Sequence, residues 1–348
     1  MKNNLLNLGE SMFFFCGVHK TLYFCACFCK LFKIMVNRRL LRVKVLQVFY
    51  AFTKKGNDSV NAAEKELLFS IEKSWELFYF LLYLLIDLGD YAASRIEISR
   101  NKKIATHEDL HPNMRFVQNL FIEELRKDSE FQKIVQGRKI NWVQYPELSK
   151  KLFQTIIDSE DYLNYMASGK NSFDEDKAFI TVLFSKYIAG LEDLDQALEE
   201  RSIYWNDDLI FATEMILKSI KKSKPGKLDL PDHVFKNEED KQFAIRLLRK
   251  SILSMDQYRD LIDTYVENWD VERIAMMDVL IMILAINEMV EFPEIPVKVS
   301  LNEYIEISKL YSSNKSGLFI NGILDKITSQ LRKDKIIIKK GRGLMGEI

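Results

Sequence analysis

Apolar residues recur at helical spacing along almost the whole chain from Met35 onward. Within 36–52, for example, Leu40, Val43 and Leu46 recur at every third position, on one face of the helix that the pattern predicts. The stretch 60–95 continues the same spacing and predicts one or two long helices. The sequence therefore favours helices over strands from the start of this region.

A second strong signal lies near the end of the chain. The stretch 270–291 is apolar nearly all round, which predicts a central helix that is buried on every side. The chain has only six prolines, and none lies between 147 and 224. This distribution suits long helices, because proline removes a backbone donor and clashes with the preceding turn. We expect an all-α fold.

The segment after the buried helix predicts two more helices. Two prolines end the buried helix, and Ser300 with Glu303 forms the pattern of a capping box, which predicts a helix start at this point. This helix is expected to run to about Leu310. A polar loop over 311–316 follows, and a further helix is expected from Gly317.

Aromatic residues indicate an internal repeat. Three tryptophans recur at nearly equal intervals, and each follows a phenylalanine at the same distance: Phe116 with Trp142, Phe179 with Trp205, and Phe243 with Trp269. If the chain arose by duplication, each unit would be a helical hairpin that buries its apolar face against its neighbour. The alternative is that apolar spacings recur by chance in a helical array.

The N-terminal extension, 1–34, differs from the rest of the chain. It holds all four cysteines (Cys16, Cys25, Cys27 and Cys29) and two short apolar blocks, each too short for a membrane span. The pattern favours a translation start at Met35. A membrane anchor and a small cysteine-based metal or redox site are the alternatives. The cysteine-free remainder is typical of a cytoplasmic protein without disulfides.

Charge limits the kind of nucleic-acid site that the chain can have. Basic and acidic residues number 50 each, so the net charge is zero and any such site must be a local basic patch. The predicted first helix is the best candidate, because it carries Arg38, Arg39 and Arg42 and no acid. Arginine side chains neutralise phosphates and stack on unpaired bases. An ordinary solvated helix start is the alternative.

Several segments resemble the NusB family. The first is the arginine-rich stretch 38–50. The others are 268–289 in the buried helix, 295–303 with its Pro296-Val297-Lys298-Val299 sequence, and 319–327, which reads Phe-Ile-Asn-Gly-Ile-Leu-Asp-Lys-Ile. The resemblance covers about 35–55 and 238–333. The chain departs from the family in length, because family members are usually less than half as long.

The resemblance implies a fold and a function. It implies NusB-like helical bundles, here with an inserted helical region for which a repeat is one interpretation. It also implies a non-enzymatic transcription antitermination factor without cofactors or metal. Such a factor binds boxA RNA together with NusE, a ribosomal protein of the small subunit, within the RNA polymerase antitermination complex of ribosomal RNA operons. No membrane association is expected.

The same resemblance divides the chain into five parts. They are an N-terminal extension at 1–34, a first NusB-like helix at 35–57, a helical insertion at 58–236, a NusB-like helical core at 237–335 and a basic tail at 336–348. Ser223 to Asp232, with two prolines and a glycine, is the strongest linker signal and supports the boundary before the core. The tail is expected to be solvated.

Candidate binding residues follow from the resemblance and from the basic helix. For RNA they are Arg38, Arg39, Arg42, Lys315 and Phe319. The Phe319 ring is equally suited to stacking on a base and to filling the core. For the partner protein they are Tyr50, Asp278 and Glu288.

Two other readings compete with RNA binding. His107 to His111 matches the H-E-x-x-H zinc motif, but Pro112 follows directly and disfavours helical geometry at His111, so we interpret it as a chance match. No phosphate-binding glycine motif is present. The remaining alternative is a helical protein-interaction scaffold with weak or no RNA binding.

Overall fold

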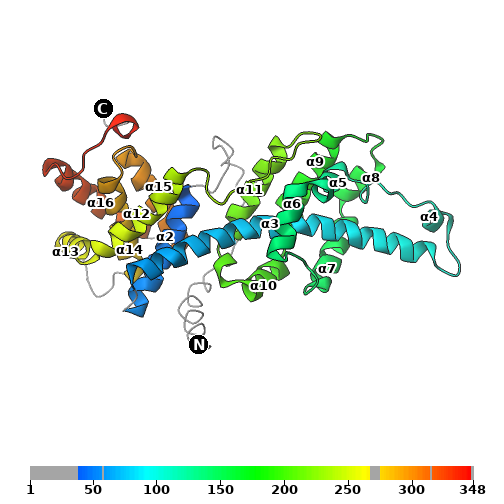
Figure 1. Cartoon of the computed structure of the whole chain (residues 1–348), viewed down its shortest axis with the longest axis horizontal. Coiled ribbons are helices and arrows are strands. Elements are labelled where there is room, and N and C mark those ends of the chain that lie inside the picture. Colours follow the sequence, from blue (N-terminus) through cyan, green and yellow to red (C-terminus); the bar gives the residue numbers. More distant parts are fainter. Residues whose placement is uncertain (1–37, 57–58, 267–274, 314–315, 346–348) are drawn as a thin grey trace. The chain divides into compact units, whose positions relative to one another are not determined.

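The computed structural model describes residues 38–56, 59–266, 275–313 and 316–345 (Figure 1). The N-terminal extension with its four cysteines lies outside the described residues. Helices make up the described part of the chain, where one isolated bridge joins Lys224 to Lys227. The predicted all-α fold is confirmed.

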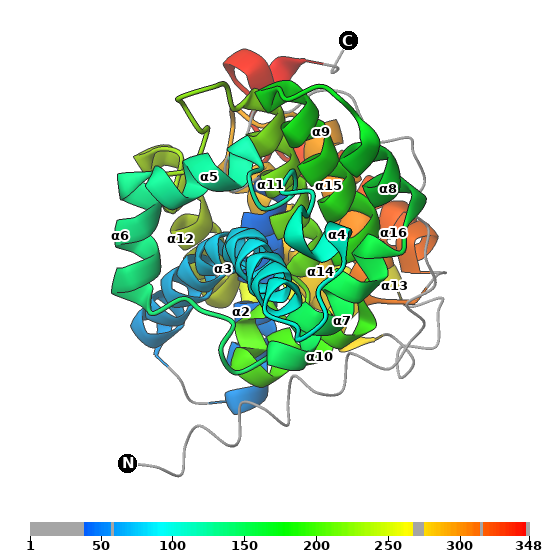
Figure 2. The same ribbon diagram turned by 90° about the vertical axis from the view of Figure 1, so that its right-hand side faces the viewer.

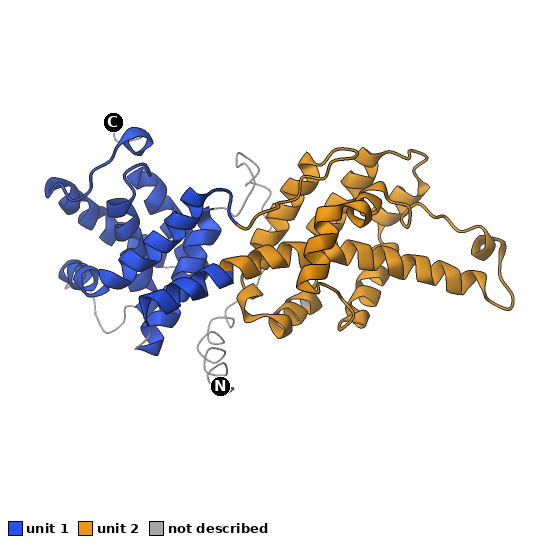
Figure 3. Ribbon diagram, in the orientation of Figure 1, with its two compact units in different colours: residues 1–31, 37–70, 235–348 blue, residues 32–36, 71–234 orange. Residues whose placement is uncertain are grey.

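The chain forms two compact units (Figure 3). Among the described residues, unit 1 takes the segment from Arg38 to Ser70 and the segment from Phe235 onward, and unit 2 takes Ile71–Val234. Unit 1 contains α2 (Arg38–Lys55), the start of α3 (Val60–Arg100), α12 (Glu238–Leu253), α13 (Met255–Val266), α14 (Met276–Glu291), α15 (Val297–Tyr311), α16 (Ser316–Lys333) and the short η4 (Gly341–Leu344). The sequence predicts the corresponding boundaries at 57/58 and 236/237, whereas the two units divide at 70/71 and 234/235.

Unit 2 contains the rest of α3 and the helices of the predicted insertion. These are α4 (His107–Leu110), α5 (Leu120–Lys127), α6 (Ser129–Arg138), α7 (Pro146–Ile157), α8 (Glu160–Ala167), α9 (Phe173–Val182), η1 (Leu183–Ile188), α10 (Glu192–Arg201), η2 (Ile203–Trp205) and α11 (Leu209–Lys222).

In unit 1, the predicted buried helix is α14. It packs against α2, α12, α13, α15 and α16, and Leu280 to Ile286 have no exposed surface. An apolar helix that is surrounded on all sides leaves no polar face, which explains its unbroken apolar sequence. The helix ends at Glu291, before Pro293, as the sequence predicts.

The predicted capping box at Ser300 is wrong. Helix α15 begins a turn earlier, at Val297 directly after Pro296. Proline has a fixed φ close to the helical value, so it can stand at a helix start. Ser300 and Glu303 lie inside the helix, where their side chains bond Glu288 and Arg39 instead of the helix end.

The basic tail is not solvated as expected; it folds back onto unit 1. Lys335 adopts a left-handed conformation (φ 57°) that ends α16, and Ile337 after it is buried. The Lys339 ammonium donates to the Phe292 carbonyl at 3.0 Å, and the Lys340 amide donates to the Pro293 carbonyl at 3.0 Å. A positive charge at the end of α14 is favourable, because the last carbonyls of a helix are unsatisfied and partly negative.

Close packing holds the same tail at its second glycine. A Cβ atom at Gly343 would lie 1.9 Å from the Pro293 carbonyl oxygen, so only glycine permits this approach. The tail is therefore seated against the corner between α14 and α15.

In unit 2, α3 forms the central axis, and Figure 2 looks along it. Trp142 and Trp205 both pack on Phe80, with ring centroids 4.1 and 5.1 Å away. Their indole N–H groups donate to the carbonyls of Phe80 and Lys73 at 3.0 and 2.8 Å. Two tryptophans that are distant in sequence thus pack on one residue of α3 and donate to carbonyls two helical turns apart.

The helices around these tryptophans follow the repeat that the sequence indicates. Helices α6 and α7 begin at Ser129 and Pro146, and α10 and α11 begin at Glu192 and Leu209. Both steps, from α6 to α10 and from α7 to α11, equal the sequence interval between the two tryptophans. Equal spacing of both helix starts and equal placement of both tryptophans favour duplication over chance. The third tryptophan, Trp269, lies outside the described residues.

One helix of the described residues, α3, is long and apolar enough to cross a membrane by length and composition. Of its most apolar window, 67% is buried inside the protein. Because the core helix of a folded domain passes the same test, this is weak evidence for a membrane span.

Replacing Phe80 by alanine is expected to destabilise unit 2 by about 3–5 kcal/mol, because both tryptophans lose their packing partner and a cavity remains. Urea unfolding followed by tryptophan fluorescence measures this, since Trp75, Trp142 and Trp205 all lie in unit 2. Ile98→Ala on the same helix and in the same unit is the control, because Ile98 is exposed. Equal losses for the two variants would refute the role given to Phe80.

Candidate nucleic-acid interface

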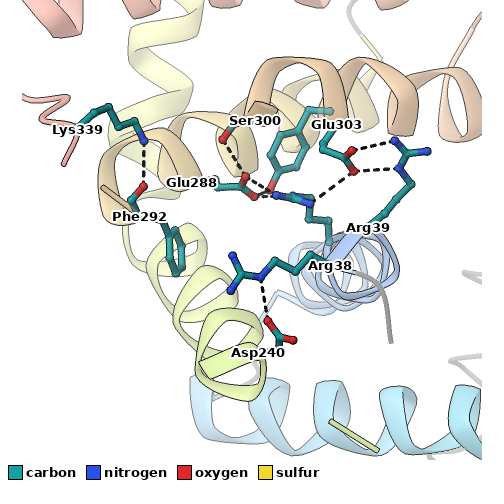
Figure 4. Close-up of polar contacts among 10 residues, drawn as sticks. Arg38, Arg39, Asp240, Glu288, Phe292, Ser300, Glu303 and Lys339 are labelled. Carbon is teal, nitrogen blue, oxygen red and sulfur yellow. Dashed lines mark hydrogen bonds and ion pairs between the residues drawn. The ribbon is translucent and has the colours of Figure 1, made fainter. Parts of the chain in front are cut away.

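The three arginines of α2 lie in three different environments (Figure 4). Arg42 is the innermost. Its Nε and Nη2 atoms donate to the two carboxylate oxygens of Glu288 on α14, both at 2.7 Å. The exposed fractions of the two side chains are 4% and 0%. Arg42 therefore lies in the interior. Its predicted role as an RNA contact is corrected, because it is a core residue.

The Glu288 carboxylate has further partners on α15. The Ser300 hydroxyl donates to one oxygen at 2.8 Å, and the Tyr304 hydroxyl donates to the other at 3.0 Å. Each carboxylate oxygen thus accepts two hydrogen bonds. This matters because a buried charge is tolerated only when it is paired and its remaining hydrogen-bonding capacity is satisfied.

Electrostatics keep Arg42 charged and Tyr304 neutral. Burial alone would lower the pKa of Arg42, but the Glu288 charge and hydrogen bonds outweigh it and raise that pKa. Burial, followed by the Glu288 charge, raises the pKa of Tyr304 well above its ordinary value, so its hydroxyl stays protonated and donates. The expectation that Glu288 faces a partner protein is corrected, because its side chain has no exposed surface.

Arg39 occupies a second, partly exposed layer. Its Nε and Nη2 atoms donate to Glu303 on α15 at 2.9 and 2.8 Å. Burial alone would raise the pKa of Glu303, but the Arg39 hydrogen bonds and the Arg42 charge outweigh it and lower that pKa. Arg39 is 25% exposed, so its outer edge alone reaches solvent.

Arg38 is the most exposed of the three, at 41%. Its Nε donates to Asp240 on α12 at 2.9 Å, and its guanidinium lies 5.2 Å from the centre of the Phe243 ring. Among the described residues its two Nη atoms have no hydrogen-bond partner. Asp240 and Phe243 therefore hold the side chain in place while its terminal donors face outward.

Comparisons with known proteins match this part of the chain. The NusB family model matches residues 208–329. The transcription antitermination protein NusB of Salinibacter ruber is 39% identical over 106 residues, which are 30% of this chain and 66% of the relative. That of Chloroherpeton thalassium is 35% identical over 137 residues, which are 39% of this chain and 64% of the relative.

A third relative is matched over more of its length. The transcription antitermination protein NusB of Alkaliphilus oremlandii is 36% identical over 101 residues, which are 28% of this chain and 73% of that protein. The chain belongs to the NusB family. It spans just under two thirds of the length of the first two relatives. No solved structure matches the chain.

The NusB match begins at Asp208 and so includes α11 of unit 2 as well as α12 to α16. It does not include 35–55, where the arginine-rich helix resembles the family. That helix, α2, packs against α12 and α14 within the matched region of unit 1.

The other predicted site residues of this NusB-family chain that the structure describes lie on three different helices, α2, α14 and α16. Tyr50 is half-buried, with the Lys54 ammonium 5.5 Å from its ring centre. Phe319 is half-buried on α16. Lys315 lies outside the described residues. Asp278 is buried in the first turn of α14, which corrects its expected contact with a partner protein.

The H-E-x-x-H match forms no metal site in the described structure. His107 and its neighbours make the single turn α4, whose Asp109 caps the turn through Thr106 and pairs with Lys102. No group of three or more His, Cys, Asp or Glu side chains in the described part of the chain could hold a metal ion.

The pairing of the arginines was not predicted, because Glu288 was expected to contact a partner protein and Glu303 to cap a helix. Glu288 carried a usable signal, because a carboxylate within a helix that is apolar all round must find a buried cation. Asp240 and Phe243 carried none for this role, since pairing between α2 and α12 joins residues that lie far apart in the sequence.

Replacing Glu288 by glutamine is expected to destabilise unit 1 by about 3 kcal/mol, because the charge on Arg42 then loses its buried counter-ion. Urea unfolding followed by circular dichroism measures the change. The control Glu306→Gln removes an exposed charge from α15 and is expected to cost less than about 1 kcal/mol.

A double variant with Arg42→Met and Glu288→Gln removes both charges at once, keeps one acceptor oxygen for the Ser300 and Tyr304 hydroxyls, and is expected to recover part of the lost stability. If Glu288→Gln costs no more than the control, the buried pair does not stabilise the fold as argued.

Proposed function

We propose that this chain is a transcription antitermination factor that binds boxA-type RNA together with NusE, in the cytoplasm, during transcription of ribosomal RNA operons. The relatives that it matches are named as transcription antitermination proteins. The observation that carries the proposal for this chain is Arg38, whose terminal donors face outward at the start of α2.

Arg38 has the chemistry that single-stranded RNA requires. Its planar fork can bond a phosphate through two donors, and the guanidinium plane can stack on an unpaired base. Asp240 and Phe243 restrain the side chain before RNA binds, which lowers the entropy lost on binding. The proposal is one of binding without catalysis or a cofactor.

Arg39, Phe319 and Lys315 complete the proposed RNA surface with smaller roles. Arg39 offers its exposed edge, and Phe319 offers part of its ring. Tyr50 is the remaining candidate for contact with NusE, because Asp278 and Glu288 lie in the interior.

A protein-interaction scaffold is the second candidate, and a specific observation favours it. Leu310 at the end of α15 and Leu318 at the start of α16 are 59% and 84% exposed. Large exposed apolar side chains at the two helix ends that flank one loop are candidate contacts for another protein. The two functions are compatible if NusE covers these leucines.

Replacing Arg38 by alanine is expected to weaken binding of a labelled boxA-like RNA by the full chain with NusE. Because one phosphate contact to a single strand contributes about 0.7 to the salt dependence, the slope of log K against log salt should fall by about that amount. Fluorescence anisotropy across a salt series measures it, and Arg38→Lys should keep the slope.

Arg259→Ala on α13 is the matched control, since Arg259 is exposed and forms no ion pair among the described residues. NusE binding should survive in both variants. If NusE binds but RNA affinity does not rise with it, joint RNA binding with NusE is refuted and the scaffold function is favoured.

A further inference from the structure

The docked tail presents cations that the rest of unit 1 leaves unpaired. Lys340 and Arg342 are exposed, and neither forms an ion pair within the described parts of the chain. Glu294, the acid that lies beside Gly341, is not ion-paired with either of them. The tail therefore adds positive charge that is available to a polyanion.

An aromatic pair connects the tail to Arg38. The Arg38 guanidinium lies 5.2 Å from the centre of the Phe243 ring, and the Phe243 and Phe292 ring centroids are 4.8 Å apart. The backbone carbonyl of Phe292 accepts the hydrogen bond from Lys339. Figure 4 shows Phe292 on the path from Lys339 to Arg38.

A further arginine stands beside the same pair of rings. The Arg246 guanidinium lies 5.3 Å from the centre of the Phe292 ring, and its side chain is half exposed. Arg246 and Lys250 share the single carboxylate of Glu291, so these three side chains carry a net positive charge. Cations thus continue from Arg38 past Phe243 and Phe292 to the tail.

We propose that Lys340 and Arg342 of the docked tail, with Arg246, form a second phosphate-binding surface that extends the Arg38 site. It rests on the proposed function, because it takes the same single-stranded RNA as ligand. RNA that contacts Arg38 would continue past the exposed Arg246, above the buried Phe243 ring, with later phosphates at the tail.

The tail can act as a binding surface because its backbone is fixed, so that its charged side chains are held in position. Buried Ile337, the Lys339 hydrogen bond and close packing at Gly343 fix the backbone on both sides of Lys340. Cations that are already in place lose less conformational entropy on binding than those of a solvated tail. RNA suits this surface better than an acidic protein, because its regular phosphates can meet a row of separate cations.

The test is a double variant of the full chain, Lys340→Ala with Arg342→Ala, in the presence of NusE. With short labelled single-stranded RNA, of boxA-like and of scrambled sequence, the salt slope should fall by about 1.4, or about 0.7 for each lost phosphate contact. The loss should be equal for both RNAs, because phosphate contacts carry no sequence information. Lys340→Arg with Arg342→Lys keeps both charges and should keep the slope.

The matched control removes one lysine and one arginine elsewhere in unit 1, by Lys326→Ala with Arg259→Ala. Both residues are exposed and form no ion pair within the described residues. An unchanged slope in the tail variant, or an equal fall in the control, overturns the proposal. If an acidic peptide loses binding instead while the RNA slope stays, the tail binds protein and the proposal fails.

Failure of this proposal is distinguishable from failure of the proposed function. If wild-type protein binds RNA and Arg38→Ala weakens it while the tail variant does not, the tail surface alone is refuted. If wild-type protein binds no RNA with NusE present, both are refuted.

Discussion

The buried ion pair between Arg42 and Glu288 is the constraint on which unit 1 depends. It joins α2 to α14, and Ser300 and Tyr304 join α15 to the same carboxylate. A charge in this interior is costly unless every partner is in place, so the three helices must meet in one register. The helix α2 is thereby fixed against a core that begins far along the chain, after the whole of unit 2.

This constraint decides which arginines remain for function. Arg38, Arg39 and Arg42 pair with three different helices, because they contact Asp240 on α12, Glu303 on α15 and Glu288 on α14. With Arg42 inside and Arg39 held by Glu303, Arg38 has the outermost donors. A basic helix start that looks uniform in sequence is thus divided between holding the fold and facing solvent.

Much of the fold could be predicted from the sequence, because helix formation and burial leave local signals. The apolar spacing of α2 and the all-round apolar pattern of α14 are such signals, and the spacing of Trp142 and Trp205 pointed to the repeated arrangement around α3. The candidate site was harder to predict from the sequence, since it depends on pairs of residues that are distant in sequence. Neither Asp240 beside Arg38 nor the seating of Lys339 on Phe292 has a local signature.

The most direct test of this account is photocrosslinking of the full chain and NusE to a short RNA that carries 4-thiouridine, with the cross-linked peptides read by mass spectrometry. We expect cross-links at the start of α2, along α12 near Phe243 and in the tail. Cross-links confined to the helices of unit 2 would contradict it, because RNA would then bind the inserted region instead of the surface built on α2.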